Sequence, residues 1–196
     1  MGQGDLFGMG DSIPKGLSYK TDLLDRAYET ALIDALAALP LAPFEFHGWV
    51  GKRRVLSFGW KYDYDKEVAE PAPAIPSFLH AIRDKAAAFA GLEARALEQA
   101  SVIEYREGAA IGWHRDKATF GTVVGVSLGS SCRFMMRRKA GTKWERYEFL
   151  AEPRSAYVLR GPARTEWEHS IPGVEALRYS ITFRERARTP ASRPSS

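Results

Sequence analysis

Two side chains with metal-binding chemistry lie two residues apart in residues 111–117, which read Ile-Gly-Trp-His-Arg-Asp-Lys. On a β-strand successive side chains alternate between faces, so His114 and Asp116 point to one side and Trp113 and Arg115 to the other. A neutral imidazole and a carboxylate are two of the three ligands of the facial triad that holds non-haem Fe(II). Such a pair is more often a structural hydrogen-bonded pair, so the metal interpretation requires a third ligand.

The third ligand has few candidates, because the chain contains four histidines. We expect His80 to be a solvated polar residue of a helix, and His47 has no evident partner in its segment. His169 follows Asp116 by 53 residues, late in a series of expected strands. In a jelly roll an early and a late strand can face each other across the interior. His114, Asp116 and His169 would then form one face of an octahedron, with positions left for a cosubstrate and oxygen.

A strand expected at residues 176–186 carries arginines on one of its faces. Alternation gives two sets of side chains: Arg178, Ser180, Thr182 and Arg184 on one face, and Tyr179, Ile181 and Phe183 on the other. Two guanidinium groups inside a barrel are costly unless an anion neutralises them. A dicarboxylate would do so well, because the arginine fork meets a carboxylate bidentately. The alternative is an exposed sheet face with both arginines in water.

The elements that must position these residues are mostly short strands. Eight are expected from residue 101 onward: 101–105, 111–116, 121–129, 132–138, 143–150, 155–160, 166–171 and 176–186. This spacing predicts a barrel or a double-sheet jelly roll. Two amphipathic helices precede it, one capped by Thr21 and stopped by Pro40, the other capped by Ser77 and ended by Gly91. We expect both to pack on the outside of the barrel.

Residues 44–76 differ from their surroundings, because aromatic and basic side chains are concentrated there between short expected strands. This composition is typical of surfaces that stack bases and hold phosphates. Trp60, Tyr62 and Tyr64 also have the period-two spacing of one half-buried strand face, which composition alone favours.

The totals predict a single soluble domain over residues 1–196. The chain is 45% hydrophobic and 27% charged, and no apolar run is long enough to span a membrane. The first residues lack the layout of a secretory signal, and Cys132 is the only cysteine, so we expect a cytoplasmic, monomeric protein. Residues 1–19 should form a loose lead-in and residues 187–196 a disordered tail.

Positive charge is concentrated in the last third of the chain. Residues 133–196 carry 14 Lys/Arg and 7 Asp/Glu, whereas residues 1–132 carry 14 and 17. This asymmetry suits a polyanionic partner such as nucleic acid. A solvated sheet face followed by a basic tail would explain it equally well.

Taken together, five segments resemble the AlkB type of Fe(II)- and 2-oxoglutarate-dependent dioxygenases. The segments are 105–109 (Tyr-Arg-Glu-Gly-Ala), 113–117 (Trp-His-Arg-Asp-Lys), 126–129 (Val-Ser-Leu-Gly), 168–171 (Glu-His-Ser-Ile) and 178–184 (Arg-Tyr-Ser-Ile-Thr-Phe-Arg). Their order and spacing agree with that family over roughly residues 54–186. A His-x-Asp pair with a late His occurs throughout the wider superfamily, whereas the Arg-Tyr-x-Ile-Thr-Phe-Arg ending is specific to the AlkB branch.

The resemblance implies an α+β, mainly β fold. Its core over residues 101–186 would be a double-stranded β-helix (jelly roll), with N-terminal helices outside and a nucleotide-recognition-lid-like segment at 44–76. His114, Asp116 and His169 would bind Fe(II) and carry the catalysis. Oxidation with O2 would convert 2-oxoglutarate to succinate and CO2, and hydroxylation of an N-methyl carbon would release formaldehyde.

The same resemblance assigns the cosubstrate and substrate contacts. Arg178 would pair with the distal carboxylate of 2-oxoglutarate, assisted by the Tyr105 hydroxyl, with Ser180 as a further hydrogen-bond donor and Arg184 near the metal-chelating end. In nucleic-acid-repairing members a lid aromatic stacks on the flipped-out base, and Trp60 has that position here.

Tyr62 and Tyr64 would be further contacts of the lid or of phosphates.

The sequence departs at three positions from the pattern of the repair enzymes. These departures affect the expected substrate recognition and one cosubstrate contact. Asparagines of the pattern are replaced by Ile103 and Ser180, and the acidic residue two after the metal aspartate is Ala118. Of the two replacements, Ser180 can still donate a hydrogen bond and Ile103 cannot.

The sequence thus predicts an oxidative dealkylase acting on N-alkylated bases in DNA or RNA. One alternative is the same oxygenase chemistry on a protein side chain or small molecule, which Ala118 and Ile103 leave open. Another is a non-catalytic barrel that binds nucleic acid, which the intact His114, Asp116 and His169 argue against.

Overall fold

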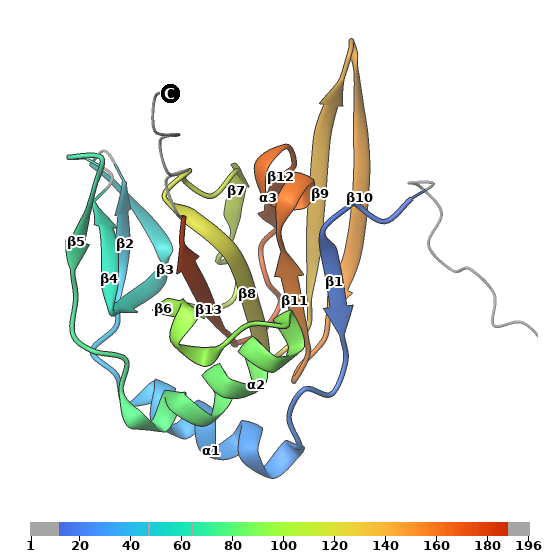
Figure 1. Cartoon of the computed structure of the whole chain (residues 1–196). Helices are drawn as coiled ribbons and strands as arrows, with labels where there is room; N and C mark the ends of the chain where they lie inside the picture. The colour runs from blue at the N-terminus through green and yellow to red at the C-terminus, as the bar shows by residue number, and fades with distance from the viewer. Residues whose placement is uncertain (1–11, 47, 64, 188–196) are drawn as a thin grey trace, which may run out of the picture.

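The computed structural model describes residues 12–46, 48–63 and 65–187, and these form two facing β-sheets with helices on the outside (Figure 1). The strands of the major sheet are β1 (Leu17–Lys20), β2 (Ala42–Phe46), β3 (Trp49–Phe58), β6 (Leu97–Tyr105), β8 (Phe120–Gly129), β11 (Ala156–Leu159) and β13 (Arg178–Arg186). Those of the minor sheet are β7 (Ile111–His114), β9 (Cys132–Ala140), β10 (Lys143–Ala151) and β12 (Glu168–Ile171). A separate hairpin joins β4 (Trp60–Asp63) to β5 (Val68–Pro71).

The strand order shows the crossovers of a jelly roll. The major sheet runs β1-β11-β8-β13-β6-β3-β2 and the minor sheet β10-β9-β12-β7, with antiparallel pairing throughout the described ladders. Consecutive strands such as β8 and β9 belong to different sheets, so the chain passes back and forth across the barrel. Each strand expected from residue 101 onward is present, and the mainly β jelly-roll prediction is confirmed.

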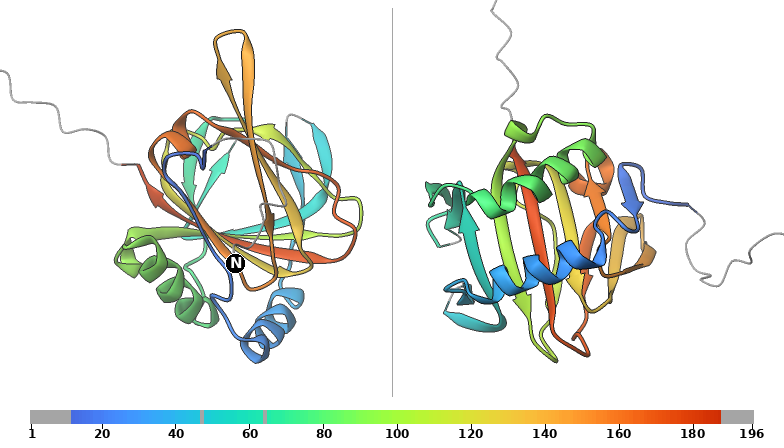
Figure 2. Two further views of the ribbon diagram at one scale, coloured as in Figure 1. Left: turned by 90° about the vertical axis from the view of Figure 1, so that its right-hand side faces the viewer. Right: turned by 90° about the horizontal axis from the view of Figure 1, so that it is seen from below.

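Helices α1 (Arg26–Ala37) and α2 (His80–Ala90) lie side by side across the outer face of the major sheet (Figure 2). A short helix, α3 (Gly161–Thr165), connects β11 to β12, and 3-10 turns occupy Ser77–Leu79 and Ala94–Ala96. The helix pair covers alternate side chains of β13 and β8, including Ile181 and Phe183, which are fully buried. This apolar burial is the main stabilising contribution of the helical layer.

A second core lies between the two sheets and includes Phe134, Tyr157 and Trp167. The barrel interior is thus bounded by the inner face of the major sheet and the inner face of the minor sheet. Within the described ranges, no helix has the length and apolar character needed to cross a membrane.

Three local expectations differ from the structure. Of the lead-in expected at residues 1–19, residues 1–11 lie outside the described residues, and residues 17–19 belong to strand β1, because Leu17 and its neighbours pair with β11 from far along the chain. Helix α1 is capped by Asp25, which accepts a hydrogen bond from the Tyr28 amide at 2.8 Å, rather than by Thr21. The Ser77 side chain makes no capping hydrogen bond; a 3-10 turn begins there instead.

Gly91 ends α2 in the left-handed conformation, with φ 66°, as expected of a C-terminal glycine. Apart from Ala187, the tail expected at 187–196 lies outside the described residues.

Candidate functional site

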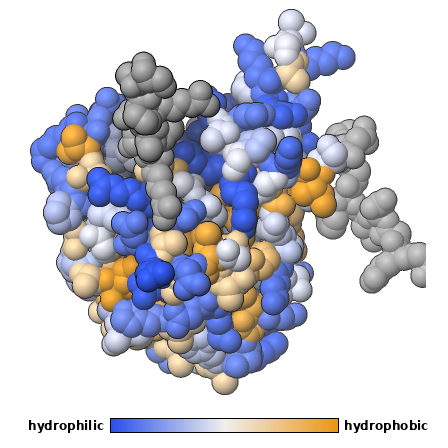
Figure 3. Space-filling model, viewed as in Figure 1, coloured by the Kyte–Doolittle hydropathy of each residue, from blue (hydrophilic) through white to orange (hydrophobic). Residues whose placement is uncertain are grey.

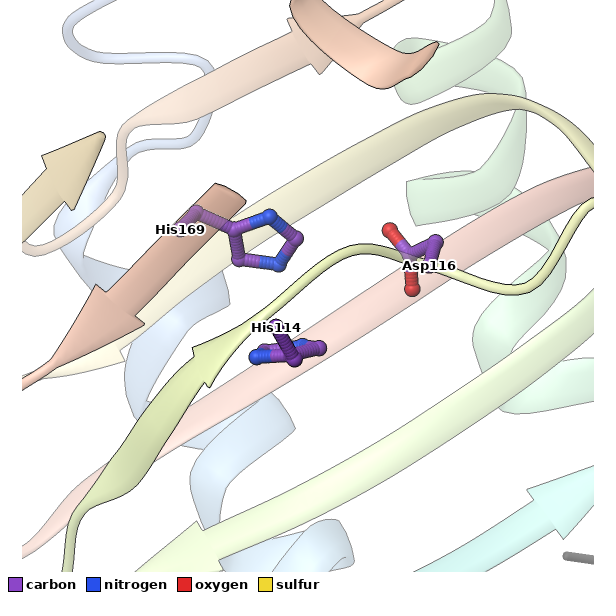
Figure 4. A group of neighbouring side chains, drawn as sticks. All are labelled: His114, Asp116 and His169. Carbon is purple, nitrogen blue, oxygen red and sulfur yellow. The ribbon is translucent and has the colours of Figure 1, made fainter. Parts of the chain in front are cut away.

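His114, Asp116 and His169 come together inside the barrel, as Figure 4 shows. One ligand atom from each residue can be chosen so that all three lie within 4.8 Å of one another. The two imidazole rings have centroids 4.2 Å apart and are inclined by 57°. Two imidazole nitrogens and one carboxylate oxygen at this separation are a donor set that fits one divalent first-row metal ion such as Fe(II).

The pairing of the minor sheet positions the two histidines. His114 ends β7 and lies directly opposite His169 on β12, so both side chains leave the sheet on the same face. The Nδ1 atom of His114 is 2.9 Å from the carbonyl oxygen of Gly112, a contact that orients the ring. The Phe134 ring stacks against His169 with centroids 5.3 Å apart.

Asp116 lies just beyond the end of β7, in the connection to β8, and is held by two arginines. Arg164 of α3 donates to the Asp116 carbonyl oxygen at 2.8 Å and to the Phe120 carbonyl oxygen at 2.5 Å. Arg184 of β13 lies 3.6 Å from the Asp116 carboxylate and donates to the Gln99 side chain at 2.9 Å. The loop therefore has a defined conformation although it belongs to no sheet.

The protonation states suit metal binding. Burial and, to a lesser extent, the nearby His114 lower the pKa of His169 to about 3. Burial also lowers the pKa of His114, although Asp116 opposes this effect. Burial alone would raise the pKa of Asp116, but Arg184 and the two imidazoles hold it below its usual value. At neutral pH the site thus presents two neutral imidazoles and one carboxylate, the forms that bind a metal.

These three side chains line one wall of a cavity between the sheets, and the opposite wall comes from the major sheet. The major-sheet wall is formed by Ile103, Tyr105, Val123, Tyr157, Leu159, Ser180, Thr182 and Arg184. Ser180, Thr182 and Arg184 come from one face of β13, whereas Tyr179 and Phe183 pack under the helices. The predicted alternation along β13 is therefore confirmed.

Arg178, the fourth polar residue on this face of β13, is fully buried. Its guanidinium carbon lies 4.9 Å from the centre of the Tyr105 ring, and its Nε donates to the Ser127 hydroxyl at 3.2 Å. The two terminal nitrogens have no hydrogen-bond partner in the described part of the chain. A buried, half-satisfied cation is expensive, and a carboxylate is the group that would satisfy both nitrogens at once.

Trp60 and Tyr62, the described site candidates of the lid-like segment, lie outside the cavity lining. Trp60 is 8% exposed and stacks on Phe120 with ring centroids 5.0 Å apart. Tyr62 is half-buried at 6.4 Å from the same ring, and Lys117 lies 5.4 Å from the Tyr62 centroid. Neither aromatic lines the cavity described above. Tyr64 lies outside the described residues, so the substrate-contact assignment of all three remains a prediction.

Several residues of the site were not anticipated from the sequence: Gln99, Phe120, Ser127, Tyr157 and Arg164. Alternation along the expected strands could have placed Ser127 on the inner face. Arg164 and Phe120 act through backbone and ring contacts between segments far apart in sequence, for which the sequence contains no local signal.

Comparison with known families agrees with this geometry. The model of the 2OG-Fe(II) oxygenase superfamily matches residues 44–184, which include the three metal-binding candidates, Arg178 and Arg184. The chain belongs to this superfamily. An oxygenase of this kind uses Fe(II), 2-oxoglutarate and O2, so the cofactor prediction is confirmed, and the donor set of the cluster fits the iron.

Two curated relatives match part of the oxygenase chain. The "Alkylated DNA repair protein ALKBH8 homolog" of Arabidopsis thaliana is 28% identical over 158 residues, covering 67% of this chain and 46% of the relative. The "Uncharacterized protein L905" of Acanthamoeba polyphaga mimivirus is 31% identical over 100 residues, covering 44% of this chain and 47% of the relative. The chain thus spans about half the length of the curated relatives it matches.

Two solved structures share the fold of this oxygenase. OsALKBH1 superposes with a TM-score of 0.69 at 16% identity, over 89% of this chain and 98% of its own. A Pseudomonas putida prolyl-4-hydroxylase superposes with a TM-score of 0.58 at 17% identity, over 89% and 94%. The superfamily match and the ALKBH8 homologue support the AlkB-like family that the sequence motifs predicted, and the OsALKBH1 superposition shows the shared fold.

Proposed function

We propose that this oxygenase removes alkyl groups oxidatively from N-alkylated bases in DNA or RNA, releasing formaldehyde, succinate and CO2. The observation that carries the oxygenase part is the His114–Asp116–His169 cluster on the wall of a cavity. Near the other wall, the buried Arg178 has two terminal nitrogens without a partner among the described residues. The similarity to a protein named for alkylated DNA repair supports the substrate class.

In this proposal His114, Asp116 and His169 hold Fe(II). When bound with 2-oxoglutarate, the iron supplies the oxidising chemistry that couples O2 to hydroxylation of the substrate carbon. The protein orients the groups and keeps water out. Hydroxylation of an N-methyl carbon gives an unstable hemiaminal, which breaks down to formaldehyde and the unmodified base.

The cosubstrate contacts come from β6 and β13. Arg178 pairs with the distal carboxylate of 2-oxoglutarate, and the Tyr105 hydroxyl, which belongs to the residue paired with Arg178 in the sheet, assists. Ser180 lines the same wall and offers a hydroxyl. Arg184 contributes positive charge near the chelating end, since it lies beside Asp116.

A basic hairpin supports a nucleic-acid substrate. Strands β9 and β10 extend beyond the rest of the barrel (Figure 2), and the far end of this hairpin is largely hydrophilic (Figure 3). Residues 132–151 carry 6 Lys/Arg and 2 Asp/Glu. Trp144 on β10 is 42% exposed and lies 4.3 Å from the Arg137 guanidinium. Cations for phosphates beside an exposed ring are features of single-strand binding surfaces.

In this proposal Trp60, Tyr62 and Tyr64 serve as lid contacts to the flipped base or its phosphates. Because Trp60 is only 8% exposed, its ring must become more accessible to meet a base. Flipping a base costs a few kcal/mol, and stacking returns about 1–3 kcal/mol per base.

The test is a panel of oligonucleotides containing 1-methyladenine or 3-methylcytosine, as DNA and RNA, single- and double-stranded. With Fe(II), 2-oxoglutarate and O2, we expect formaldehyde and succinate in equal amounts and loss of the methyl group. His169→Ala should abolish both products, whereas His80→Ala, a change at an exposed helical histidine, should not. Succinate formation that no methylated oligonucleotide stimulates would contradict the nucleic-acid substrate.

A second candidate is the same oxygenase reaction on a protein side chain or small molecule. The shared fold with a prolyl-4-hydroxylase and the covered Trp60 ring favour it. It predicts 2-oxoglutarate turnover stimulated by a peptide or metabolite library and unaffected by oligonucleotides.

A further inference from the structure

Tyr157 is a polar residue of the cavity that no sequence motif singled out. It lies on β11 and lines the same space as His114 and Ser180, with only 6% of its surface exposed. Among the described residues its hydroxyl makes no hydrogen bond, and the side chain faces the cavity. A hydroxyl that faces a ligand cavity without a protein partner is available to donate a hydrogen bond to the ligand.

The adjacent strand makes room for this side chain. Tyr157 lies directly opposite Gly125 on β8. A Cβ atom at position 125 would overlap the outer ring carbons and the hydroxyl oxygen of Tyr157. The phenol therefore lies across the glycine, and its hydroxyl points toward the middle of the sheet, where β13 follows β8. Only a residue without a side chain at 125 permits this placement.

The ladder places Gly125 opposite Thr182 on β13, one step along the same face from the level of Ser127 and Ser180. Gly125 and Ser127 are two residues apart on the same face of β8, a spacing of about 7 Å. Ser127 is the residue whose hydroxyl accepts the Nε–H of Arg178. Burial raises the pKa of the Tyr157 hydroxyl, and Arg178 opposes this only in part. The hydroxyl therefore keeps its proton at neutral pH and is a donor.

The neighbouring wall position 103 supplies no side-chain hydrogen-bond donor for a bound carboxylate. Ile103 lies opposite Ser180 in the β6–β13 ladder and offers no hydrogen bond. Two carboxylate oxygens have about four acceptor sites, more than one guanidinium fork fills.

We propose that the Tyr157 hydroxyl donates a hydrogen bond to the distal carboxylate of 2-oxoglutarate, alongside Arg178 and Tyr105. This assignment rests on the proposed function, because it requires 2-oxoglutarate in the cavity. Tyr157 is then a specificity-determining residue: its hydroxyl favours a five-carbon dicarboxylate over a keto acid that ends in a methyl group. Gly125 is the residue that makes the contact possible.

The experiment measures cosubstrate affinity directly, without turnover. The Mn(II)-loaded protein is titrated calorimetrically under nitrogen with 2-oxoglutarate and with 2-oxopentanoate, which has the same chain length but no distal carboxylate. Tyr157→Phe removes only the hydroxyl. Tyr147→Phe, at a half-buried tyrosine of β10 that does not line the cavity, is the matched control.

A hydrogen bond to a charged group predicts that Tyr157→Phe weakens 2-oxoglutarate binding by about tenfold to a hundredfold. Binding of 2-oxopentanoate should be unchanged, and Tyr147→Phe should change neither. Unaltered 2-oxoglutarate affinity in Tyr157→Phe, or equal loss for both keto acids, would overturn the assignment to the distal carboxylate. If the wild-type protein binds Mn(II) but no 2-oxoglutarate, the proposed function itself fails.

Discussion

Each face of the major sheet buries a charged side chain. The one on the outer face is stabilised by hydrogen bonds within the chain, whereas the one on the inner face is only partly paired. On the outer face, Glu104 of β6 is 4% exposed and accepts hydrogen bonds from Tyr179 at 3.0 Å and Arg106 at 2.9 Å. Arg54 lies 3.2 Å from the same carboxylate. On the inner face, Arg178 is fully buried with both terminal nitrogens unpaired among the described residues.

The difference separates a structural charge from a binding charge. Burial alone would raise the pKa of Glu104, but its hydrogen bonds hold the pKa below its usual value, so the chain itself stabilises this carboxylate. Nothing in the described chain does the same for the terminal nitrogens of Arg178. A buried ion without a partner is tolerated only where a ligand completes it, so the inner face is organised for an anion.

Arg178→Met should give the largest effect and would sharpen this contrast. Removing one partner of a buried charge pair predicts a loss of 2-oxoglutarate binding free energy of about 2–5 kcal/mol. The free energy of unfolding should stay within about 1 kcal/mol of wild type, because the two terminal nitrogens lost have no partner among the described residues. Calorimetry and urea denaturation measure the two quantities.

Arg186→Met is the matched control, since Arg186 lies at the exposed end of the same strand. It should change neither quantity. If Arg178→Met instead destabilised the fold strongly and left the affinity of the folded protein intact, the binding interpretation of the inner face would be wrong.

Glu104→Gln should reverse the pattern. Loss of the carboxylate weakens hydrogen bonds from Tyr179 and Arg106 and should lower the free energy of unfolding by about 1–3 kcal/mol. Folded protein should bind 2-oxoglutarate as before. Glu98→Gln, at an exposed position of the same strand, serves as control. A specific loss of cosubstrate affinity in Glu104→Gln would break the distinction between the faces.

The buried imidazoles predict acid sensitivity of the metal-free protein. The pKa of His169 is about 3 when folded, below its unfolded value of about 6.5. Because the unfolded state then binds more protons, stability is fully present above the unfolded pKa and falls as the pH decreases toward the folded pKa. The pKa of His114 is shifted in the same direction.

Between about pH 7 and about pH 5, His169 alone should cost roughly 1–2 kcal/mol of unfolding free energy. Protonation of Asp116, whose pKa is also lowered, should reduce the unfolding free energy further only in stronger acid. His169→Leu should flatten the curve measured by denaturation in this range, whereas His80→Ala should not. A curve of equal slope in His169→Leu would contradict the neutral buried imidazole.

The exposed hairpin should give the smallest effect on stability. Lys139, Lys143 and Arg146 lie on β9 and β10, away from either core. Changing all three to Gln should alter the unfolding free energy by no more than about 0.5 kcal/mol per site. Binding to a single-stranded oligonucleotide should weaken, and the salt slope should fall by about 1 for each lost phosphate contact. An unchanged salt slope would contradict a contact between the hairpin and the oligonucleotide.

Much of this arrangement was predictable because strand alternation is a local property. The separation of Arg178 and Ser180 from Ile181 and Phe183 follows from a period of two, and the structure follows it. The pairing of His114 with His169 required the jelly-roll topology, which the number and spacing of expected strands indicated.

Other features depend on contacts that no local pattern encodes. Strand β1 forms because β11 offers it a free edge, and Gly125 matters only because Tyr157 crosses it. Trp60 had the spacing of a lid aromatic, yet its burial against Phe120 depends on how two distant segments meet. The expected cap at Thr21 was wrong because Asp25, closer to the helix, supplies the capping oxygen.

The most direct test of the central claim is to mix the wild-type protein with Fe(II) and 2-oxoglutarate in the absence of O2. If His114, Asp116 and His169 hold iron beside the cosubstrate, a weak visible charge-transfer band of the chelated cosubstrate should appear. His169→Ala should lack the band. A wild-type protein that binds iron but develops no band on addition of 2-oxoglutarate would contradict the account.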